Sequence, residues 1–486
     1  RPQSYTVTRR PTGMSDPFVV VGGDAAGLSA ASKLRREDPD REVIVFEKGQ
    51  WVSFAHCGTP YFVKGEVESL TDLLSLTPED VAERGIDLRR GREVVAVDPD
   101  ARVVTVETPE GTREQPYGDL LVATGARAAQ GPFGTMDRDG AFTLHGMDSA
   151  AAIRALLTPP AEFAVEDLGG DDYLDAERAA RYGAMEPPER VAVVGGGYVG
   201  VEMAEALDAW GLDVEVFQRS GTVLPGFGAA IGERVEDHLK AEGVEVHCDT
   251  PVDALLGEDR VTGVRVGENR IPADMALVGV GVRPNTELLN GTGIDRDDRG
   301  TVVVDRYGRT SAPDVYAAGD CATAFHAVTG QRAWVPLGLT ANRAGRAVGT
   351  TVAGEPTPVG TTAGTAAVKA MALEAGRTGI IDHEAAREAG YDPVSETITA
   401  GSRSGYYPGG SETTVTLTAD RGTGRLLGGA IVGRDRAAIR IDTVATALEG
   451  GLTVAELERS DLAYAPPFSP VWDPVLVAAK VLGGSL

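Results

Sequence analysis

Two glycine-rich segments, each lying between a hydrophobic strand and a helix, constrain the fold of this 486-residue chain more than any other feature. Residues 18–27 read FVVVGGDAAG, and residues 191–200 read VAVVGGGYVG. A turn of this kind lets a pyrophosphate approach the backbone at a helix N-terminus, where unpaired N–H groups favour negative charge. The chain therefore predicts an α/β protein with two Rossmann-like dinucleotide-binding domains.

The first glycine segment departs from the full GxGxxG pattern, because Asp24 replaces one of its glycines. The next strand, residues 41–47, reads REVIVFE and ends in Glu47, whose carboxylate could accept hydrogen bonds from an adenosine ribose. A solvated strand-end charge is the alternative for Glu47, but the strand–turn–helix–strand order favours the ribose role. The residues expected to contact this nucleotide are Gly22, Gly23, Ala26, Gly27, Glu47 and Lys48.

The second glycine segment is complete, and the strand after it ends without an acid. A carboxylate at that strand end would repel a 2′-phosphate, whereas Arg219 could pair with one. This favours NADPH over NADH, with a solvent-exposed Arg219 as the alternative. The residues expected to contact this nucleotide are Gly195, Gly197, Tyr198, Gly200, Gln218 and Arg219.

Three further motifs occur along the chain. They are LLVATGA at 120–126, between the two glycine segments, and GVRPNTEL at 281–288 and YAAGDC at 316–321, after the second. Together with the glycine segments, they resemble the flavoprotein disulfide reductases with two dinucleotide sites, also called pyridine nucleotide-disulfide oxidoreductases. The resemblance covers nearly the whole chain and implies FAD at the first site and NAD(P)H at the second. It also implies FAD contacts at Thr124, Gly125, Gly281, Gly319 and Asp320, the aspartate binding the ribityl chain.

The same resemblance implies a split architecture. Residues 14–155 and 280–356 would form the FAD-binding domain, with the NAD(P)H-binding domain at 189–279 inserted between them. An α+β C-terminal dimerisation domain would occupy 360–486. The acidic insertion at 159–188 is longer than the family usually has there, and we expect a surface loop with a short helix and no chemistry.

The segment SFAHCGTPY at 53–61 holds a single cysteine, Cys57, and the residue five positions later is Phe62. No disulfide can form within this segment. The pattern resembles the single-cysteine branch of the family, which includes coenzyme A-disulfide reductases, NADH oxidases and NADH peroxidases. Such a cysteine shuttles between thiolate and a mixed disulfide or sulfenic acid. A position at a helix start is expected to lower its thiol pKa.

Other residues sharpen the comparison within this branch. Many oxidases and the peroxidases have a histidine in the first glycine loop, where this chain has Ala25, as the coenzyme A-disulfide reductases do. The resemblance implies that tyrosines of the C-terminal domain reach the active site from the partner subunit of a homodimer. A phenol could protonate or stabilise the leaving thiolate. The tyrosines are Tyr406, Tyr407 and Tyr464, with interface packing as the alternative, which we favour for one of the adjacent pair.

The resemblance also implies substrate contacts in two places. Lys33 and Arg36 could meet the phosphates of coenzyme A, although pairing with Glu37 and Asp38 would explain them equally well. Ser53 and His56 fall where the family contacts substrate, with His56 in place of the usual asparagine.

The function predicted from these residues is electron transfer from NADPH through FAD and Cys57 to coenzyme A disulfide or a related small disulfide. The first alternative is an NAD(P)H oxidase that reduces O2 through a Cys57 sulfenic acid. Persulfide or polysulfide reduction is a further variant. A non-enzymatic flavoprotein is disfavoured because it would need neither Cys57 nor the tyrosines.

Composition excludes other classes of function. The net charge of −26 and the six lysines argue against a nucleic-acid partner. No apolar run approaches the length of a membrane span, and neither a secretory signal nor metal-ligand spacing is evident, the six histidines being scattered without pairing. Three cysteines without a disulfide framework predict a reducing cytoplasm. The acidic surface also raises the hypothesis of adaptation to concentrated salt.

Overall fold

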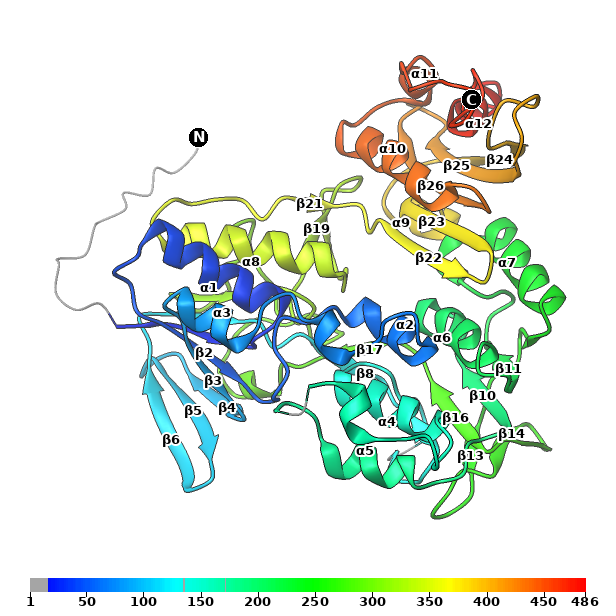
Figure 1. Cartoon of the computed structure of the whole chain (residues 1–486). Coiled ribbons are helices and arrows are strands. Elements are labelled where there is room, and N and C mark those ends of the chain that lie inside the picture. The colour runs from blue at the N-terminus through cyan, green and yellow to red at the C-terminus, as the bar shows by residue number, and fades with distance from the viewer. Residues whose placement is uncertain (1–15, 134–135, 171) are drawn as a thin grey trace.

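The first domain is built on a parallel sheet of five strands, shown at the left of Figure 1. This computed structural model describes residues 16–133, 136–170 and 172–486. The central strand is apolar and wholly buried, which agrees with a sheet covered on both faces. In spatial order the strands are β18 (Val315–Ala317), β7 (Asp119–Val122), β1 (Phe18–Val21), β2 (Val43–Glu47) and β3 (Asp87–Arg90).

Two helices, α1 (Ala25–Glu37) and α8 (Gly338–Val352), pack closely against each other in this domain. Small residues allow this approach, because a Cβ on Gly345 would lie 2.1 Å from the Ala26 carbonyl oxygen. The contact brings a C-terminal part of the domain against its first helix. The remaining elements of the domain are α3 (Pro78–Glu83) and an antiparallel meander of β4 (Val94–Asp98), β5 (Val103–Thr108) and β6 (Gly111–Pro116).

The second domain repeats the parallel sheet. Its order is β12 (Glu245–His247), β11 (Asp213–Phe217), β10 (Arg190–Val194), β16 (Met275–Val278) and β9 (Ala141–Phe142). The two sheets confirm the predicted α/β class with two Rossmann-like domains. Helices α4 (Met147–Leu157), α6 (Tyr198–Asp208) and α7 (Ala229–Ala241) and the antiparallel strands β13 (Ala254–Leu256), β14 (Gly263–Val266) and β15 (Asn269–Pro272) complete this domain.

One boundary differs from the expectation. Strand β9 lies within the 14–155 segment that we assigned to the FAD-binding domain, yet it pairs in parallel with β16 of the second sheet. Its side chains are buried there, because Phe142 packs against Tyr182 with ring centroids 5.0 Å apart. We therefore propose that the first segment of the FAD-binding domain ends before β9.

Two short antiparallel strands, β8 (Ala126–Ala128) and β17 (Val282–Pro284), join the outgoing and returning connections between the two domains. The C-terminal domain holds an antiparallel sheet of β22 (Ala366–Ala370), β23 (Leu373–Gly379), β26 (Leu426–Gly433), β25 (Glu412–Asp420) and β24 (Pro393–Gly401). Helices α10 (Ala437–Glu449) and α12 (Pro474–Gly483) pack against this sheet, beside the shorter α9 (His383–Glu388) and α11 (Val454–Glu458).

The acidic insertion contains a 3-10 turn (Val165–Leu168) and the helix α5 (Ala176–Gly183). It is more than a surface loop, because Leu168 and Tyr182 are buried. Tyr173 packs against Trp51, six positions before Cys57, with ring centroids 5.4 Å apart. Separately, no helix among the described residues is long and apolar enough to cross a membrane.

Candidate active site

Cys57 lies in a 3-10 turn (His56–Gly58) that leads directly into α2 (Thr59–Lys64). The backbone of Ser53, which has a positive φ of 47°, fixes this segment against the first glycine loop. Its N–H donates to the Gly23 carbonyl at 3.1 Å, and its own carbonyl accepts from Ser75 N at 2.7 Å. The single cysteine and the predicted FAD loop are therefore held next to each other by backbone hydrogen bonds.

The glycines of the first loop are required by the local backbone. Gly22 has a φ of +113°, and a Cβ there would lie 2.1 Å from the Ala123 carbonyl oxygen. A Cβ on Gly27 would lie 1.9 Å from the Gly22 carbonyl oxygen, so Gly27 allows helix and strand to pack closely. Glu47 accepts from Gly23 N at 2.8 Å and from Gly49 N at 2.7 Å. Burial raises its pKa, and the two N–H groups oppose this effect.

The second loop has the same geometry. Gly195 has a φ of +107°, and a Cβ there would collide with the Gly279 carbonyl oxygen at 2.4 Å. A Cβ on Gly200 would lie 1.8 Å from the Gly195 carbonyl oxygen, whereas one on Gly197 would meet nothing within 4 Å. This open cradle at the start of α6 fits a dinucleotide pyrophosphate. Gln218 replaces the acid at the strand end and accepts from Gly196 N at 3.0 Å.

The basic residues proposed for the two nucleotides are exposed. Arg219 follows Gln218 and makes no hydrogen bond or ion pair within the described part of the chain, which leaves its guanidinium available. Lys48 is also exposed. Tyr198, at the start of α6, accepts a hydrogen bond from Arg377 Nε at 2.8 Å on its hydroxyl and packs on Phe227.

The segments 120–126 and 281–288 are in contact with each other. This contact is required if both segments contribute to one FAD site. Asn285 donates through Nδ2 to the Thr124 carbonyl at 3.0 Å and through its backbone N to the Gly125 carbonyl, also at 3.0 Å. The Thr124 hydroxyl in turn donates to the Asn285 carbonyl. At Gly125 and Gly281 the φ angles are positive, and a Cβ would meet nothing within 4 Å.

A carboxylate–imidazole pair that the sequence did not predict lies beside Cys57. The Asp24 carboxylate is 2.5 Å from His56 Nε2, and His56 Nδ1 is 2.9 Å from the His145 carbonyl oxygen. Burial disfavours the imidazolium, but the hydrogen bond and charge of Asp24 outweigh it and raise the pKa of His56. The ring centroids of His56 and His145 lie 5.3 Å apart.

Asp320 adds a second carboxylate to this charged group. Burial raises the pKa of Asp320 to about 6, while the charge of His56 works in the opposite direction. Its backbone carbonyl accepts a hydrogen bond from Trp334 Nε1 at 2.9 Å. Gly319, with a φ of +86°, lies close to Ala26 of α1, so the late motif is packed against the first glycine loop.

The expected low pKa of Cys57 is not found in the protein alone. The residue is exposed, but the protein packed around it limits its hydration and raises its thiol pKa, and the charges of Glu202 and Asp320 raise it further. Burial, together with the two carboxylates, therefore outweighs the effect of the helix start on the Cys57 pKa.

Glu202 is a site residue that our sequence analysis missed. It lies on α6 of the second domain and accepts a hydrogen bond from the Tyr61 hydroxyl at 3.0 Å. Burial raises the pKa of Glu202 to about 7. A glutamate two residues after the last loop glycine was the available signal, but only the folded chain brings it to Cys57.

An ion cluster centred on a buried glutamate ties α2 to both other domains. Glu205, three residues after Glu202 on α6, pairs with Lys64 at 2.7 Å and with Lys369 of β22. Its second oxygen accepts from Met371 N at 2.7 Å. Two of the six lysines in the chain thus gather on one carboxylate, and α2 lies where the three domains meet (Figure 1).

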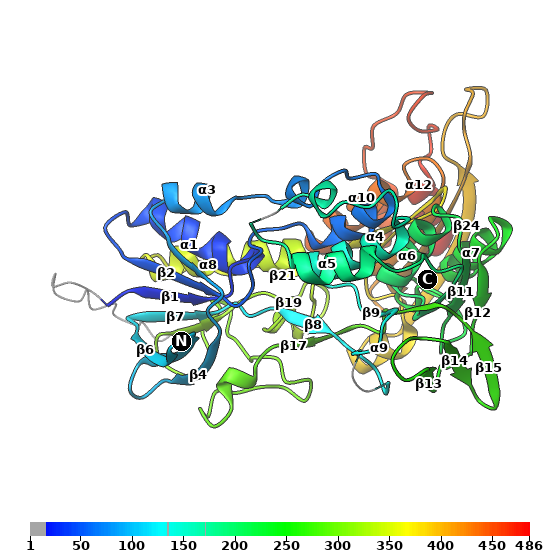
Figure 2. The same cartoon turned by 60° about the horizontal axis from the view of Figure 1, so that its bottom comes forward.

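The predicted catalytic tyrosines are exposed on the C-terminal domain. Tyr406 is 76% exposed and Tyr464 is 48% exposed, and their hydroxyl oxygens lie 3.5 Å apart. Tyr407 is 37% exposed. Figure 2 shows the loops before β25 and before α12 projecting from the body of the protein. The structure thus brings Tyr406 and Tyr464 together on a projecting surface.

The basic residues predicted to contact substrate lie on α1. Lys33 pairs with Glu37, which is the structural alternative named for it, and Arg36 is exposed. Their contact with substrate stays a prediction.

The other two cysteines have local partners. Cys248 donates to a Glu236 carboxylate oxygen at 3.1 Å, and Cys321 is buried, with its sulfur 3.4 Å from the Val122 carbonyl oxygen. One group of candidate metal ligands, Glu215, Glu245 and His247, lies in the second sheet with its ligand atoms within 4.8 Å of one another. A hydrogen-bonding distance of 3.0 Å between His247 Nε2 and Glu215 accounts for part of that closeness.

Comparisons with known families agree with this geometry. The family model described as pyridine nucleotide-disulphide oxidoreductase matches residues 16–345. The model of the dimerisation domain of the same family matches residues 365–474.

Individual relatives match over nearly their full length. An NAD(P)H coenzyme A polysulfide/persulfide reductase of Pyrococcus horikoshii is 36% identical over 472 residues, which cover 96% of this chain and 99% of the relative. A coenzyme A disulfide reductase of Staphylococcus aureus is 30% identical over 456 residues, which cover 93% of this chain and 96% of the relative.

Two solved structures are similar throughout. An NAD-dependent persulfide reductase from A. fulgidus superposes with a TM-score of 0.87 and 31% identity, covering 96% of this chain and 83% of that one. An engineered water-forming NADPH oxidase, bound to NADPH, superposes with a TM-score of 0.85 and 25% identity, covering 96% and 98%.

Proposed function

Because this chain belongs to the pyridine nucleotide-disulfide oxidoreductase family, we propose that it carries electrons from NADPH through FAD to coenzyme A disulfide or a related small disulfide. It is an FAD-dependent oxidoreductase of the coenzyme A-disulfide reductase kind. The observation that carries the proposal is the position of Cys57, which the backbone of Ser53 ties to the first glycine loop.

The reaction requires two exchanges at sulfur. The Cys57 thiolate attacks one sulfur of the substrate, forms a mixed disulfide and expels one thiolate. Two electrons from NADPH then cleave the mixed disulfide, so that one NADPH, one proton and one disulfide give NADP⁺ and two thiols. Bound FAD supplies the two-electron transfer between nicotinamide and sulfur. The residues of the first loop would hold FAD, and those of the second would hold the nicotinamide nucleotide.

The preference for NADPH rests on the residues that follow β11. A free guanidinium at Arg219 and the absence of a strand-end acid suit a 2′-phosphate. The engineered NADPH oxidase carries three successive substitutions that create Ala-Arg-Ser, 18 residues after a substituted glycine. This chain has Arg219-Ser220, and Gln218 lies at the same interval after Gly200.

Persulfide reduction is a second candidate. It is favoured by the functions for which the Pyrococcus horikoshii relative and the A. fulgidus enzyme are named. The same cysteine could attack a sulfur–sulfur bond in either substrate, so Cys57 alone does not separate them. Oxygen reduction is disfavoured by Ala25, which stands where many oxidases have a histidine.

We propose that the working enzyme is a homodimer in which Tyr406 or Tyr407, with Tyr464, serves the partner's Cys57 site. Their exposure on projecting loops supports this arrangement. Lys33, Arg36, Ser53 and His56 are the proposed contacts with the substrate.

The test is an anaerobic assay with NADPH or NADH against coenzyme A disulfide and coenzyme A persulfide, with oxygen uptake measured in parallel. We expect Cys57→Ser to lower disulfide turnover by at least about 1,000-fold, because it removes the nucleophile. The matched control Cys248→Ser should keep wild-type turnover. Mass spectrometry should also find a reducible coenzyme A adduct on Cys57. Undiminished turnover by Cys57→Ser would sink the proposal, and oxygen uptake without disulfide turnover would establish the oxidase.

A further inference from the structure

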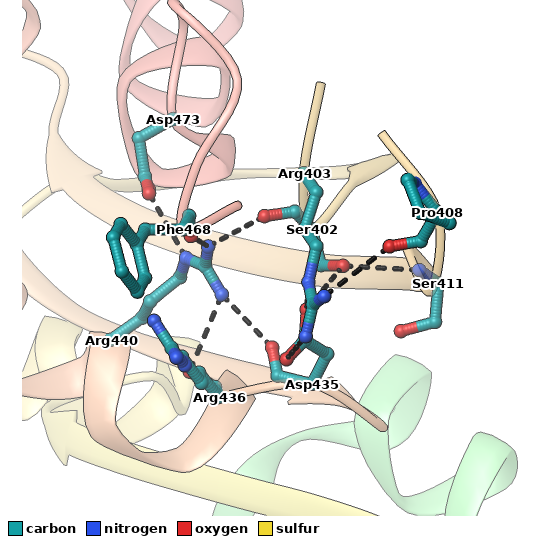
Figure 3. Close-up of polar contacts among 9 residues, drawn as sticks. All are labelled: Ser402, Arg403, Pro408, Ser411, Asp435, Arg436, Arg440, Phe468 and Asp473. Atoms are coloured by element: carbon teal, nitrogen blue, oxygen red, sulfur yellow. Dashed lines mark hydrogen bonds and ion pairs between the residues drawn. The ribbon is translucent and has the colours of Figure 1, made fainter. Parts of the chain in front are cut away.

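A buried arginine joins the two loops that carry the exposed tyrosines. Arg440 lies on α10 and is 9% exposed. Its guanidinium donates to five oxygen atoms, which are shown in Figure 3. They are Asp473 Oδ2 at 2.9 Å, the Asp435 carbonyl at 3.0 Å, the Arg436 carbonyl at 3.4 Å, the Ser402 carbonyl at 2.8 Å and the Phe468 carbonyl at 3.0 Å.

These acceptors come from separate parts of the C-terminal domain. Ser402 directly follows β24 and precedes Tyr406 by four residues. Phe468 follows Tyr464 by four residues. The Nη2 group of Arg440 therefore binds the backbone of both tyrosine loops. In each loop the bound carbonyl lies four residues from the tyrosine.

Asp473 fixes the C-terminal end of the second loop, which carries Tyr464. It caps α12 by accepting from Val475 N at 2.9 Å, and it also accepts from the Ser469 hydroxyl at 3.0 Å. The Arg436 guanidinium lies 4.8 Å from the centre of the Phe468 ring. The segment between Tyr464 and α12 is thus held by its backbone, by a side-chain ring and by a helix cap.

A second ion pair closes the base of the first loop. Arg403 binds the Asp435 carboxylate through two nitrogen atoms, at 2.6 and 2.9 Å, and holds the pKa of that carboxyl below its usual range. The Ser402 hydroxyl donates to the same carboxylate at 2.9 Å. Ser411, at the far end of the loop, donates through its backbone N to the Ser402 hydroxyl at 3.0 Å.

Between these anchors, the first loop is supported by the Tyr407 N–H, which donates to the Ser404 carbonyl at 2.8 Å, and by Arg403 Nη1, which donates to the Pro408 carbonyl at 3.4 Å. It contains Gly405, Gly409 and Gly410, and a Cβ on Gly405 would meet nothing within 4 Å. Tyr406 is largely exposed, and its hydroxyl oxygen lies 3.5 Å from that of Tyr464. The position of the phenols is therefore determined at the base of the loops, where the arginines lie.

We propose that Arg440, with Asp435, Asp473 and Arg403, forms a clamp that holds Tyr406 and Tyr464 in the arrangement needed for disulfide reduction. In this role Arg440 is a positioning residue, because it reaches the reaction only through the tyrosines. The inference rests on the proposed function, in which those phenols serve the partner's Cys57 site.

The clamp can be tested with Arg440→Lys, which keeps the charge but loses the planar fork that reaches both loops. The matched control is Arg421→Lys, an exposed arginine in the same domain that pairs with Asp392. We expect Arg440→Lys to lower kcat/KM for coenzyme A disulfide about tenfold, while flavin bleaching by NADPH changes by less than about twofold. The control should change neither quantity, and both variants should remain dimers.

A double-mutant cycle separates positioning from general damage. If Arg440 acts through the phenol, Arg440→Lys should cost little further turnover when Tyr406 is already Phe. Equal losses in flavin reduction and disulfide turnover, losses that multiply with Tyr406→Phe, or no loss at all would each overturn the proposal.

The clamp can also be judged if the enzyme reduces no disulfide. Chymotrypsin cleaves after exposed tyrosines, so Arg440→Lys should speed cleavage at Tyr406 and Tyr464 several-fold, measured by mass spectrometry of the fragments. Unchanged cleavage rates would exclude the clamp independently of the substrate. Faster cleavage together with wild-type protein that turns over no disulfide would support the clamp and reject the proposed function.

Discussion

The two glycine loops have nearly the same backbone but different side chains. Gly22 and Gly195 have φ angles of +113° and +107°, and a Cβ on either would strike a backbone carbonyl of the neighbouring connection. In each loop the residue after this glycine donates its N–H to the side chain that ends the second strand, Glu47 or Gln218. The shared part is therefore the one that a pyrophosphate requires.

The loops differ at the position where the second has an open glycine. Gly197 faces free space, whereas Asp24 places a carboxylate 2.5 Å from His56. The first loop thus carries a carboxylate whose hydrogen bond and charge favour the protonated form of His56.

The helices after the loops differ as well. Ser29 on α1 donates to Asn342 of α8 at 2.7 Å, whereas the corresponding Glu202 on α6 accepts from Tyr61 of α2. One helix therefore contacts its own domain at this position, and the other contacts the helix that begins beside Cys57. This asymmetry gives the second domain an electrostatic connection to the cysteine.

The largest effect should come from copying the first loop into the second. Gly197→Asp places a carboxylate in the open cradle without a histidine to balance it. We expect NADPH to bind about 100-fold more weakly, because an unpaired charge would face the pyrophosphate, a penalty of about 3 kcal/mol. Titration of the bound nucleotide by fluorescence measures this loss, and FAD content should stay at the wild-type level. Normal NADPH affinity would show that the loops are interchangeable.

The second-largest effect concerns the residue Arg219 after β11, which should distinguish NADPH from NADH. Arg219→Gln is expected to raise the KM for NADPH about tenfold, because it removes a charge-assisted hydrogen bond of about 1.5 kcal/mol. The KM for NADH should change by less than about twofold. Steady-state kinetics with both nucleotides check this, with Arg270→Gln as a control at an exposed position of β15. Equal losses for NADPH and NADH would contradict a role for Arg219 in binding the 2′-phosphate.

The third prediction concerns the pairing of Asp24 with His56 in the first loop. His56→Ala leaves Asp24 unpaired, and we expect FAD to bind about fivefold more weakly, in line with the modest strength of a partly exposed ion pair. Asp24→Gly in the same variant should restore the affinity, because the loop then resembles the second one. Equilibrium dialysis of FAD measures both changes. A double variant as weak as His56→Ala would exclude charge balance as the cause.

The smallest effect concerns the helix residue Glu202. Its pKa is raised to about 7, so it is charged above that pH and then raises the pKa of Cys57. Glu202→Gln should therefore speed alkylation of Cys57 by iodoacetamide about threefold at pH 8, which corresponds to about half a pKa unit. At pH 5.5 to 6 the two proteins should react alike, because Glu202 is then neutral.

A second variant checks the same mechanism. The hydrogen bond from Tyr61 stabilises the charged form of Glu202 and lowers its pKa. Tyr61→Phe should therefore move the onset of the Glu202 effect to higher pH. A pH-independent difference between wild type and Glu202→Gln would contradict an electrostatic role.

Several features could be read from local sequence alone. The valine strands, the glycine turns and the strand-end residues lie within a few positions of one another, so their order along the chain predicts both Rossmann-like sheets. Two outcomes were decided by a distant contact. Strand β9 joined the second sheet, and the carboxylate of Glu202, 145 residues from Cys57, helped to raise a thiol pKa that was expected to be low.

By itself, the sequence determined the α/β class, the family and the presence of a single cysteine in the segment 53–61, because each depends on short, contiguous patterns. Only the tertiary structure decided the pairing of Asp24 with His56, the approach of Glu202 to Cys57 and the convergence of two tyrosine loops on Arg440. The first two contacts join residues that are 32 and 145 positions apart, and the two tyrosine loops meet on a third element, α10. Charges act through space, so folding had to bring these groups together before their pKa values and hydrogen bonds were defined.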